Sequence, residues 1–155
     1  ALEALEPQAR AAELDGARVD ITRELADHLP DVEVDPDAMT DALLNVLQNA
    51  LRYTGRDKEI RVRVTAREKN VDIAITDNGP GIARHEQSKI FEKFYRVVDP
   101  ALPNVEGTGL GLSMVHHVVR AHAGRITVES DVGRGATFTI SLPAMAPKTT
   151  AAEAA

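Results

Sequence analysis

The sequence contains no cysteine and no tryptophan, and aromatic residues make up only 3% of its 155 positions. The absence of cysteine excludes disulfides and cysteine-ligated metal sites, and it fits a reducing compartment weakly. With so few aromatic side chains, the core must be built from Leu, Val, Ile and Ala. No apolar run reaches the roughly 18 residues that a membrane span requires, and no signal peptide is visible.

Positive charge is also in short supply, since the formal net charge is −6. This balance argues against nucleic acid as the main partner, because neutralising phosphates requires clustered Lys and Arg. A small anionic ligand is still compatible with this charge, because a pocket can be locally basic.

The length predicts one domain with a sizeable core. We expect this domain over 1–142, followed by a disordered tail over 143–155, which is rich in Ala, Pro, Thr and Lys. The first residue is Ala1, not Met, so we expect a fragment of a longer protein.

Hydrophobic periodicity predicts the order of the elements. In chain order we expect a helix over 1–15 that Pro7 kinks or interrupts, short strands around 19–21 and 32–34, a helix over 37–53, a hairpin over 60–76, a short helix over 83–91, a loop over 96–106, a helix over 109–123, and closing strands over 126–128 and 138–142. This order predicts an α+β sandwich in which one mostly antiparallel sheet is covered on one face by helices.

The helix over 37–53 has an unusual polar stripe. Asn45 and Asn49 lie one turn apart on it, opposite a broad apolar face. Because Asn is a poor helix former, such a pair indicates a role beyond helix formation. A solvated polar face is the alternative interpretation, and for the pair alone it is the favoured one.

Two glycine clusters, at 77–82 (DNGPGI) and 107–113 (GTGLGLS), are typical of backbone that approaches a ligand closely. The chain has no G-x-x-x-x-G-K-[ST] motif, and GTGLG is not a Rossmann fingerprint. The Asp77 carboxylate, at a predicted strand end, can accept a hydrogen bond from the exocyclic amine of adenine but not from the carbonyl of guanine. The Asn49 side-chain oxygen, with Asn45 beside it, suits Mg²⁺. Candidate partners for phosphate are Arg52, Lys93, Arg96 and the amides of 109–111.

Four blocks in order carry a resemblance to a known family. They are 45–50 (NVLQNA) with Tyr53, 77–82, 91–96 (FEKFYR) and 107–113, and they resemble the N, G1, F and G2 boxes of sensor histidine kinases. The resemblance covers about 1–142. It implies the GHKL, or Bergerat-type, ATP-binding fold, with Asn49 holding Mg²⁺, Asp77 holding adenine, and a mobile ATP lid over Tyr95–Glu106.

The sequence departs from the family pattern in two ways. Glu106 stands where the G2 block usually has its first glycine. None of the five histidines lies in a phosphoacceptor-like segment, so we expect no autophosphorylation by this chain alone. The resemblance therefore implies a separate histidine-bearing dimerisation domain, a response regulator receiver domain downstream, and a dimeric, membrane-anchored parent whose cytoplasmic fragment here is a monomer. Relatives that hydrolyse ATP carry a Glu base at the position of Asn45.

The predicted cofactors are ATP and Mg²⁺, with Asn45 and Asn49 as the catalytic residues and Asn49 as the metal ligand. The predicted nucleotide-binding residues are Asn49, Arg52, Tyr53, Asp77, Gly79, Gly81, Ile82, Lys93, Arg96, Gly107, Thr108, Gly109, Leu110, Gly111 and Leu112. Two alternatives stay open: a nucleotide-binding regulatory or interaction module without transfer activity, and a GHKL serine kinase or ATPase.

Overall fold

The computed structural model describes residues 1–98 and 107–146. Its elements, in chain order, are α1 (Leu2–Leu14), β1 (Arg18–Leu25), α2 (Pro36–Tyr53), β2 (Asp57–Arg67), β3 (Asn70–Asp77), α3 (Arg84–Gln87), the 3₁₀ helix η1 (Lys89–Phe91), α4 (Gly111–Ala121), β4 (Arg125–Ser130) and β5 (Ala136–Pro143).

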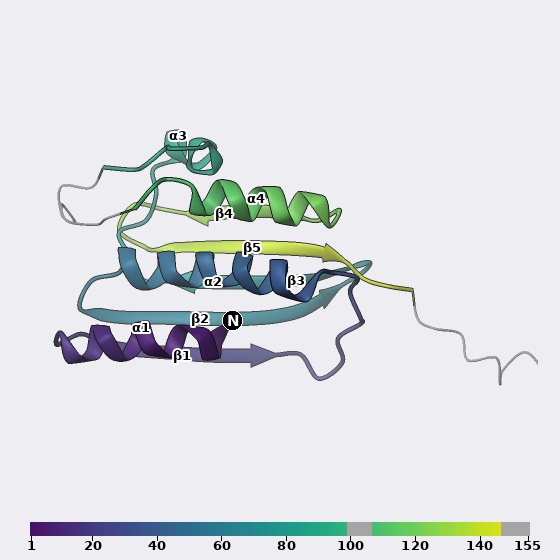
Figure 1. Ribbon diagram of the computed structural model, residues 1–155, viewed down its shortest axis with the longest axis horizontal. Coiled ribbons are helices and arrows are strands. Elements are labelled where there is room, and N and C mark those ends of the chain that lie inside the picture. Colours follow the sequence, from purple (N-terminus) through teal and green to yellow (C-terminus); the bar gives the residue numbers. More distant parts are fainter. Residues whose placement is uncertain (99–106, 147–155) are drawn as a thin grey trace, which may run out of the picture.

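The five strands form one sheet in the order β1-β2-β3-β5-β4. Strand β1 runs parallel to β2, and every other neighbouring pair is antiparallel. Helices α1, α2 and α4 lie over one face of the sheet, whereas the short α3 lies near the N-terminal end of α4 (Figure 1). The prediction of a mostly antiparallel sheet covered on one face is therefore confirmed.

Strand alternation determines what the helices cover. Ile60 pairs with Asp77, which in turn pairs with Ala136, so these three residues form a cross-strand row. The next row on the same face of the sheet consists of Val62, Ile75 and Phe138, and all three are buried. Because side chains in one register row point to the same face, Asp77 lies at the end of the apolar inner face.

Helix α2 packs on this inner face. The Asp35 side chain caps its N-terminus by accepting hydrogen bonds from the backbone N–H groups of Asp37 and Ala38, each at 3.0 Å. Pro36 follows at the first helical position, where its missing N–H is not needed. The start that the sequence predicts for this helix is thus one residue late.

Helix α1 is continuous through Pro7, so the expected interruption is wrong. Pro7 lies in the second turn and removes only one intrahelical hydrogen bond. Leu5, with 0% exposure, anchors the helix in the core. The burial of this side chain offsets the weaker backbone bonding.

The predicted strand around 32–34 is also wrong, because Val32 forms only an isolated bridge with Ala144. Flanking prolines, Pro30 and Pro36, leave too few backbone donors for a longer ladder. The same bridge shows that the ordered chain extends past the expected start of the tail, since Pro143 still belongs to β5. The remainder of the predicted tail, 147–155, lies outside the described residues.

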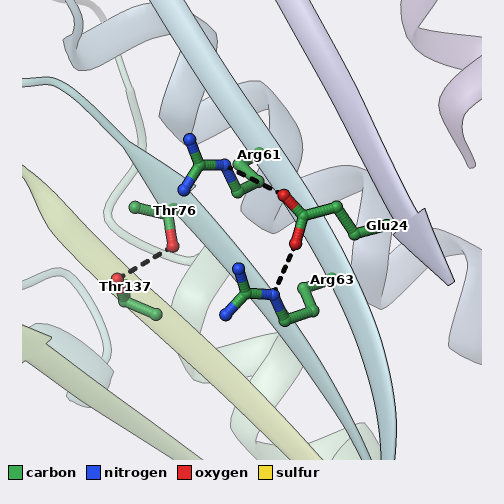
Figure 2. A network of polar contacts seen from close by, with 5 residues as sticks. All are labelled: Glu24, Arg61, Arg63, Thr76 and Thr137. Atoms are coloured by element: carbon green, nitrogen blue, oxygen red, sulfur yellow. Dashed lines mark hydrogen bonds and ion pairs between the residues drawn. The ribbon is translucent and has the colours of Figure 1, made fainter. Parts of the chain in front are cut away.

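The opposite face of the sheet is polar and open. Glu24 lies between two arginines of β2, with 3.5 Å from its Oε1 to Nε of Arg61 and 2.7 Å from its Oε2 to Nε of Arg63 (Figure 2). The hydroxyls of Thr76 and Thr137 form a 2.9 Å hydrogen bond across β3 and β5. Both arginines thus line an exposed face of the sheet, and such exposed ion pairs contribute little to stability.

Candidate functional site

A cavity of about 330 Å³ opens where the C-terminal half of α2, the end of β3 and the start of α4 meet. Its wall contains thirteen of the residues that the sequence singles out: Asn45, Asn49, Arg52, Tyr53, Asp77, Gly81, Ile82, Arg96, Gly107, Thr108, Gly109, Gly111 and Leu112. Blocks that are far apart in the sequence thus line a single concave site, and the polar stripe of α2 faces this cavity.

Asp77 supplies the carboxylate of the cavity. Its Oδ1 accepts a hydrogen bond of 2.8 Å from the backbone N–H of Gly79. Burial raises the pKa of the Asp77 carboxyl above its ordinary value, while the backbone N–H groups of Gly79 and Ala136 act in the opposite direction. A partly desolvated carboxylate with fixed orientation is well suited to accept a hydrogen bond from a ligand amine.

The two asparagines of α2 differ in their surroundings. The Nδ2 group of Asn45 donates to the carbonyl of Asp41 at 3.0 Å, and a methyl group added at Gly111 would lie 3.1 Å from its Oδ1. Among the described residues, the Asn49 amide has no hydrogen-bonding partner, although it lines the cavity. Its oxygen is therefore available to a hard cation such as Mg²⁺, which binds one or two protein oxygens together with phosphates.

Two glycines are required by close backbone contacts. A Cβ on Gly81 would lie 2.1 Å from the carbonyl oxygen of Asp131, and one on Gly109 would lie 2.7 Å from the carbonyl carbon of Phe94. Both glycines have a positive φ, 76° and 72°, which other residues rarely adopt. Phe94 also donates its backbone N–H to the carbonyl of Gly109 at 2.9 Å, so the two glycine segments are held against neighbouring loops.

The basic side chain of Arg52 lies beside the second glycine cluster. A methyl group at Gly107 would lie 3.2 Å from its guanidinium nitrogen. Helix α4 begins at Gly111, and its first intrahelical bond runs from the N–H of Met114 to the carbonyl of Leu110 at 3.0 Å. The free N–H groups of the first turn and the Arg52 guanidinium together make this end of the cavity favourable to an anion.

Three predicted residues do not line the cavity. Gly79 lies beneath Asp77 and holds its carboxylate, as described above. Leu110 precedes α4 and donates its N–H to the Thr108 hydroxyl at 3.3 Å. Lys93 is exposed and lies away from the cavity wall. The predicted lid over Tyr95–Glu106 falls mostly outside the described residues, and its mobility stays a prediction.

The cavity also has walls that were not predicted from the sequence. They come from Gln48, Ala50, Pro80, Ile90, Tyr95, Val97, Ala136 and Phe138. The two β5 residues enter because β5 inserts next to β3, an arrangement that alternation alone does not specify. Gln48, Ala50, Pro80 and Tyr95 belong to the four sequence blocks that resemble the family, and this membership was the one available signal.

The histidines outside this cavity have structural surroundings. His116 and His117 are exposed on α4, and the His116 ring lies 5.9 Å from that of Phe91. His122 is half-buried and both of its ring nitrogens have partners: its Nε2 accepts a hydrogen bond from the N–H of Asp35 at 3.0 Å, and its Nδ1 lies 2.7 Å from the Val118 carbonyl oxygen.

Within 1–98 and 107–146, no group of three or more His, Cys, Asp or Glu side chains is arranged to hold a metal ion. None of the helices in this part of the chain is long and apolar enough to cross a bilayer.

Comparison with known proteins identifies the family. Residues 34–146 match the model of the histidine kinase-, DNA gyrase B- and HSP90-like ATPases. The chain belongs to this family. Within it, the chain is 40% identical over 117 residues to the sensor histidine kinase ZraS of Escherichia coli K12, covering 76% of this chain and 24% of ZraS. It is 38% identical over 131 residues to the adaptive-response sensory kinase SasA of Synechococcus sp. strain JA-2-3B'a(2-13), covering 84% of this chain and 34% of SasA.

Solved structures of the same family share the fold. The catalytic domain of the histidine kinase ThkA, in a nucleotide-free form, superposes with a TM-score of 0.74 at 26% identity, covering 91% of this chain and 87% of that one. Full-length ShkA in complex with AMPPNP superposes with a TM-score of 0.75 at 28% identity, covering 93% of this chain and 28% of that one. The chain is thus an ATP-binding-type domain of the sensor histidine kinase group and spans a quarter to a third of the length of its curated relatives.

Proposed function

We propose that this chain binds Mg-ATP in the cavity and donates the γ-phosphate to a histidine on a separate dimerisation domain of a two-component sensor kinase. The observation that carries the proposal is the convergence of Asp77, Asn49 and the first turn of α4 on one cavity. The carboxylate comes from the end of β3, and the anion-favouring groups come from Arg52 and the start of α4. This combination of groups matches a nucleotide whose base offers an amine and whose tail is a polyphosphate.

Each group has a defined task in this proposal. Asp77 accepts a hydrogen bond from the exocyclic amine of adenine, and Asn49 supplies an oxygen ligand to Mg²⁺. Arg52, Arg96 and the backbone N–H groups at the start of α4 contact the phosphates. Bound Mg²⁺ neutralises charge on the phosphates during transfer.

The transfer itself breaks the bond between the γ-phosphorus and the β,γ-bridging oxygen, and it forms a bond from phosphorus to an imidazole nitrogen. ADP leaves, and the imidazole proton passes to solvent. Asn45 carries an amide, which cannot accept a proton from water near neutral pH, so direct hydrolysis of ATP is expected to be slow. The chain therefore keeps the γ-phosphate for the incoming histidine.

The context of the activity follows from the relatives. ZraS and SasA are sensor kinases, and the chain matches only 24% and 34% of them. We propose that the rest of the parent provides the phosphoacceptor domain and a membrane anchor, that the parent is a homodimer, and that a response regulator receiver domain takes the phosphate. The isolated chain is proposed to be a cytoplasmic monomer.

Phosphate transfer in trans tests the proposal. The chain is incubated with γ-labelled Mg-ATP and a purified histidine-containing dimerisation domain, and label on that domain is measured. We expect acid-labile label that is lost when the acceptor histidine is replaced by Gln. Nucleotide binding without any label on several acceptor domains would instead favour a nucleotide-binding interaction module.

A further inference from the structure

A single hydroxyl connects two segments that wall the Asp77 end of the cavity. Ser130, the last residue of β4, accepts a hydrogen bond at its Oγ from the backbone N–H of Ile82 at 2.8 Å. The same Oγ donates to the carbonyl of Gly135 at 2.6 Å. Ile82 follows the first glycine cluster, whereas Gly135 directly precedes Ala136, and both Ile82 and Ala136 line the cavity.

The Gln87 side chain also connects the 77–82 loop with the end of β4. Its Nε2 donates to the carbonyl of Ile82 at 2.9 Å and to the carbonyl of Ser130 at 2.8 Å. Both hydrogens of the amide are thus used across three elements, α3, the 77–82 loop and β4. A further bond of 2.7 Å, from the N–H of Gly133 to the carbonyl of Pro80, joins the β4–β5 turn to this loop.

Backbone groups at the end of the β4–β5 turn also contact Asp77. Gly135 packs so closely on Asp77 that an added Cβ would lie 1.9 Å from the Asp77 carbonyl oxygen. The next N–H, that of Ala136, stabilises the ionised carboxyl of Asp77. A shift of the β4–β5 turn would therefore move both the Ile82 wall and a hydrogen-bond donor to Asp77.

We propose that Ser130 and Gln87 are positioning residues that set the separation and orientation of the Ile82 and Ala136 walls around Asp77, and hence the fit of the adenine base. This inference rests on the proposed function of the cavity. Neither side chain is part of the cavity wall. Both act only through the backbone groups that they bind.

The role is specific to the base end of the nucleotide. The Ser130 and Gln87 bonds end on the 77–82 loop and the β4–β5 turn, whereas the proposed phosphate contacts are Arg52 and the start of α4. Loss of the Ser130 or Gln87 hydrogen bonds is therefore expected to weaken ADP and ATP binding by the same factor, with or without Mg²⁺. A loss at the phosphate end would instead depend on the number of phosphates and on the metal.

The first test is Ser130→Ala, measured by calorimetric titration with ADP and ATP at a temperature where the variant is folded. We expect Kd to rise about three- to tenfold for both nucleotides, because one hydroxyl with two hydrogen bonds is removed. Ser130→Thr keeps the hydroxyl and is expected to stay within about twofold of the unmutated chain. The matched control is Ser141→Ala, whose hydroxyl bonds Asp72 on the open sheet face and is expected to leave Kd unchanged.

Gln87, a half-buried residue of the short helix α3, provides a second variant. Gln87→Glu has the same shape, but its carboxylate would face the carbonyls of Ile82 and Ser130, so a similar rise in Kd is expected for ADP and ATP. Gln87→Met removes the bonds without adding charge and is expected to give a smaller rise in the same direction.

The outcomes separate the two levels of the argument. If the unmutated chain binds neither nucleotide, the proposed function fails. If it binds both and Kd is unchanged in Ser130→Ala and Gln87→Glu, the positioning role alone is overturned. A loss confined to ATP, or equal losses in Ser130→Ala and Ser130→Thr, would also overturn it.

Discussion

At the scale of single residues, Asp77 is half-buried, although an ionised carboxylate is more stable in water. Its carboxyl lies at the end of the apolar inner face, in register with Ile60 and Ala136. Two backbone N–H groups support the ionised form, but burial has the larger effect, and the pKa is raised. Such a cost is typical of a residue retained for ligand binding and not for stability.

The first prediction concerns the stability of Asp77→Asn. Because the folded-state pKa is raised, the ionised carboxyl is less favourable in the folded chain than in the unfolded chain. Asp77→Asn is therefore expected to raise the thermal midpoint of the nucleotide-free chain at pH 7 by up to a few degrees. The gain should shrink as the pH falls through the folded-state pKa of Asp77, where the native carboxyl becomes neutral. A lower midpoint at pH 7 would contradict this account of the site.

Asn45 permits a test of how the site treats water. Asn45→Glu introduces a general base beside the start of α4, and general bases contribute about 10²–10⁴-fold in rate where they are correctly placed. Basal ATP hydrolysis is expected to stay equal or to rise. Asn45→Gln introduces an amide side chain of the same length as Glu, and it should give no rise in hydrolysis. A clear fall in hydrolysis specific to Asn45→Glu would count against the role assigned to Asn45.

At the scale of elements, His122 ties the end of α4 to the start of α2. A backbone N–H can only donate, so the bond from Asp35 requires an unprotonated Nε2, and Nδ1–H must then donate to Val118. We expect nitrogen NMR shifts of the Nδ1–H tautomer. We also expect His122→Ala to lower the free energy of unfolding by about 1–2 kcal/mol. His117→Ala, on the exposed face of the same helix, is the control, and equal effects of the two variants would argue against this link.

The C-terminus of α2 depends on Lys58 in a comparable way. Its Nζ donates to the carbonyls of Leu51 at 2.8 Å and Thr54 at 2.9 Å, and burial lowers its pKa. Lys58→Met is expected to cost about 1–2 kcal/mol of stability, because two carbonyls at the negative end of the helix lose their donor. Chemical denaturation measures this cost. The exposed Lys69→Met serves as reference and should change stability by less than about 0.5 kcal/mol.

The elements also show what the sequence could predict. Periodicity was sufficient for α2, the β2–β3 hairpin and α4, because each has a long apolar pattern. It failed at 32–34, where two alternating valines lie between prolines. It also could not predict which strands are neighbours, so the contributions of Ala136 and Phe138 to the cavity were missed. The bonds of Ser130 and Gln87 join residues 43 and 48 positions apart, and no local pattern indicates them.

At the scale of the whole molecule, the sheet together with α2 and α4 supports the cavity that contains Asp77. Blocks from α2, the end of β3 and the start of α4 meet there because β3 is central and both helices pack on the same face. The family pattern predicted this convergence, whereas composition and charge only restricted the class of ligand. In the proposed function the phosphate acceptor lies on a separate domain, so nucleotide binding is the part of that function that this chain can be tested for alone.

The central claim is that the cavity selects an adenine nucleotide through Asp77. Calorimetric titration of the chain with ATP and with GTP, each with and without Mg²⁺, and of Asp77→Asn with ATP, tests it most directly. We predict saturable ATP binding to the unmutated chain, at least about tenfold weaker binding to Asp77→Asn, and no measurable binding of GTP. Equal affinity for ATP and GTP, or full ATP affinity in Asp77→Asn, would contradict the account.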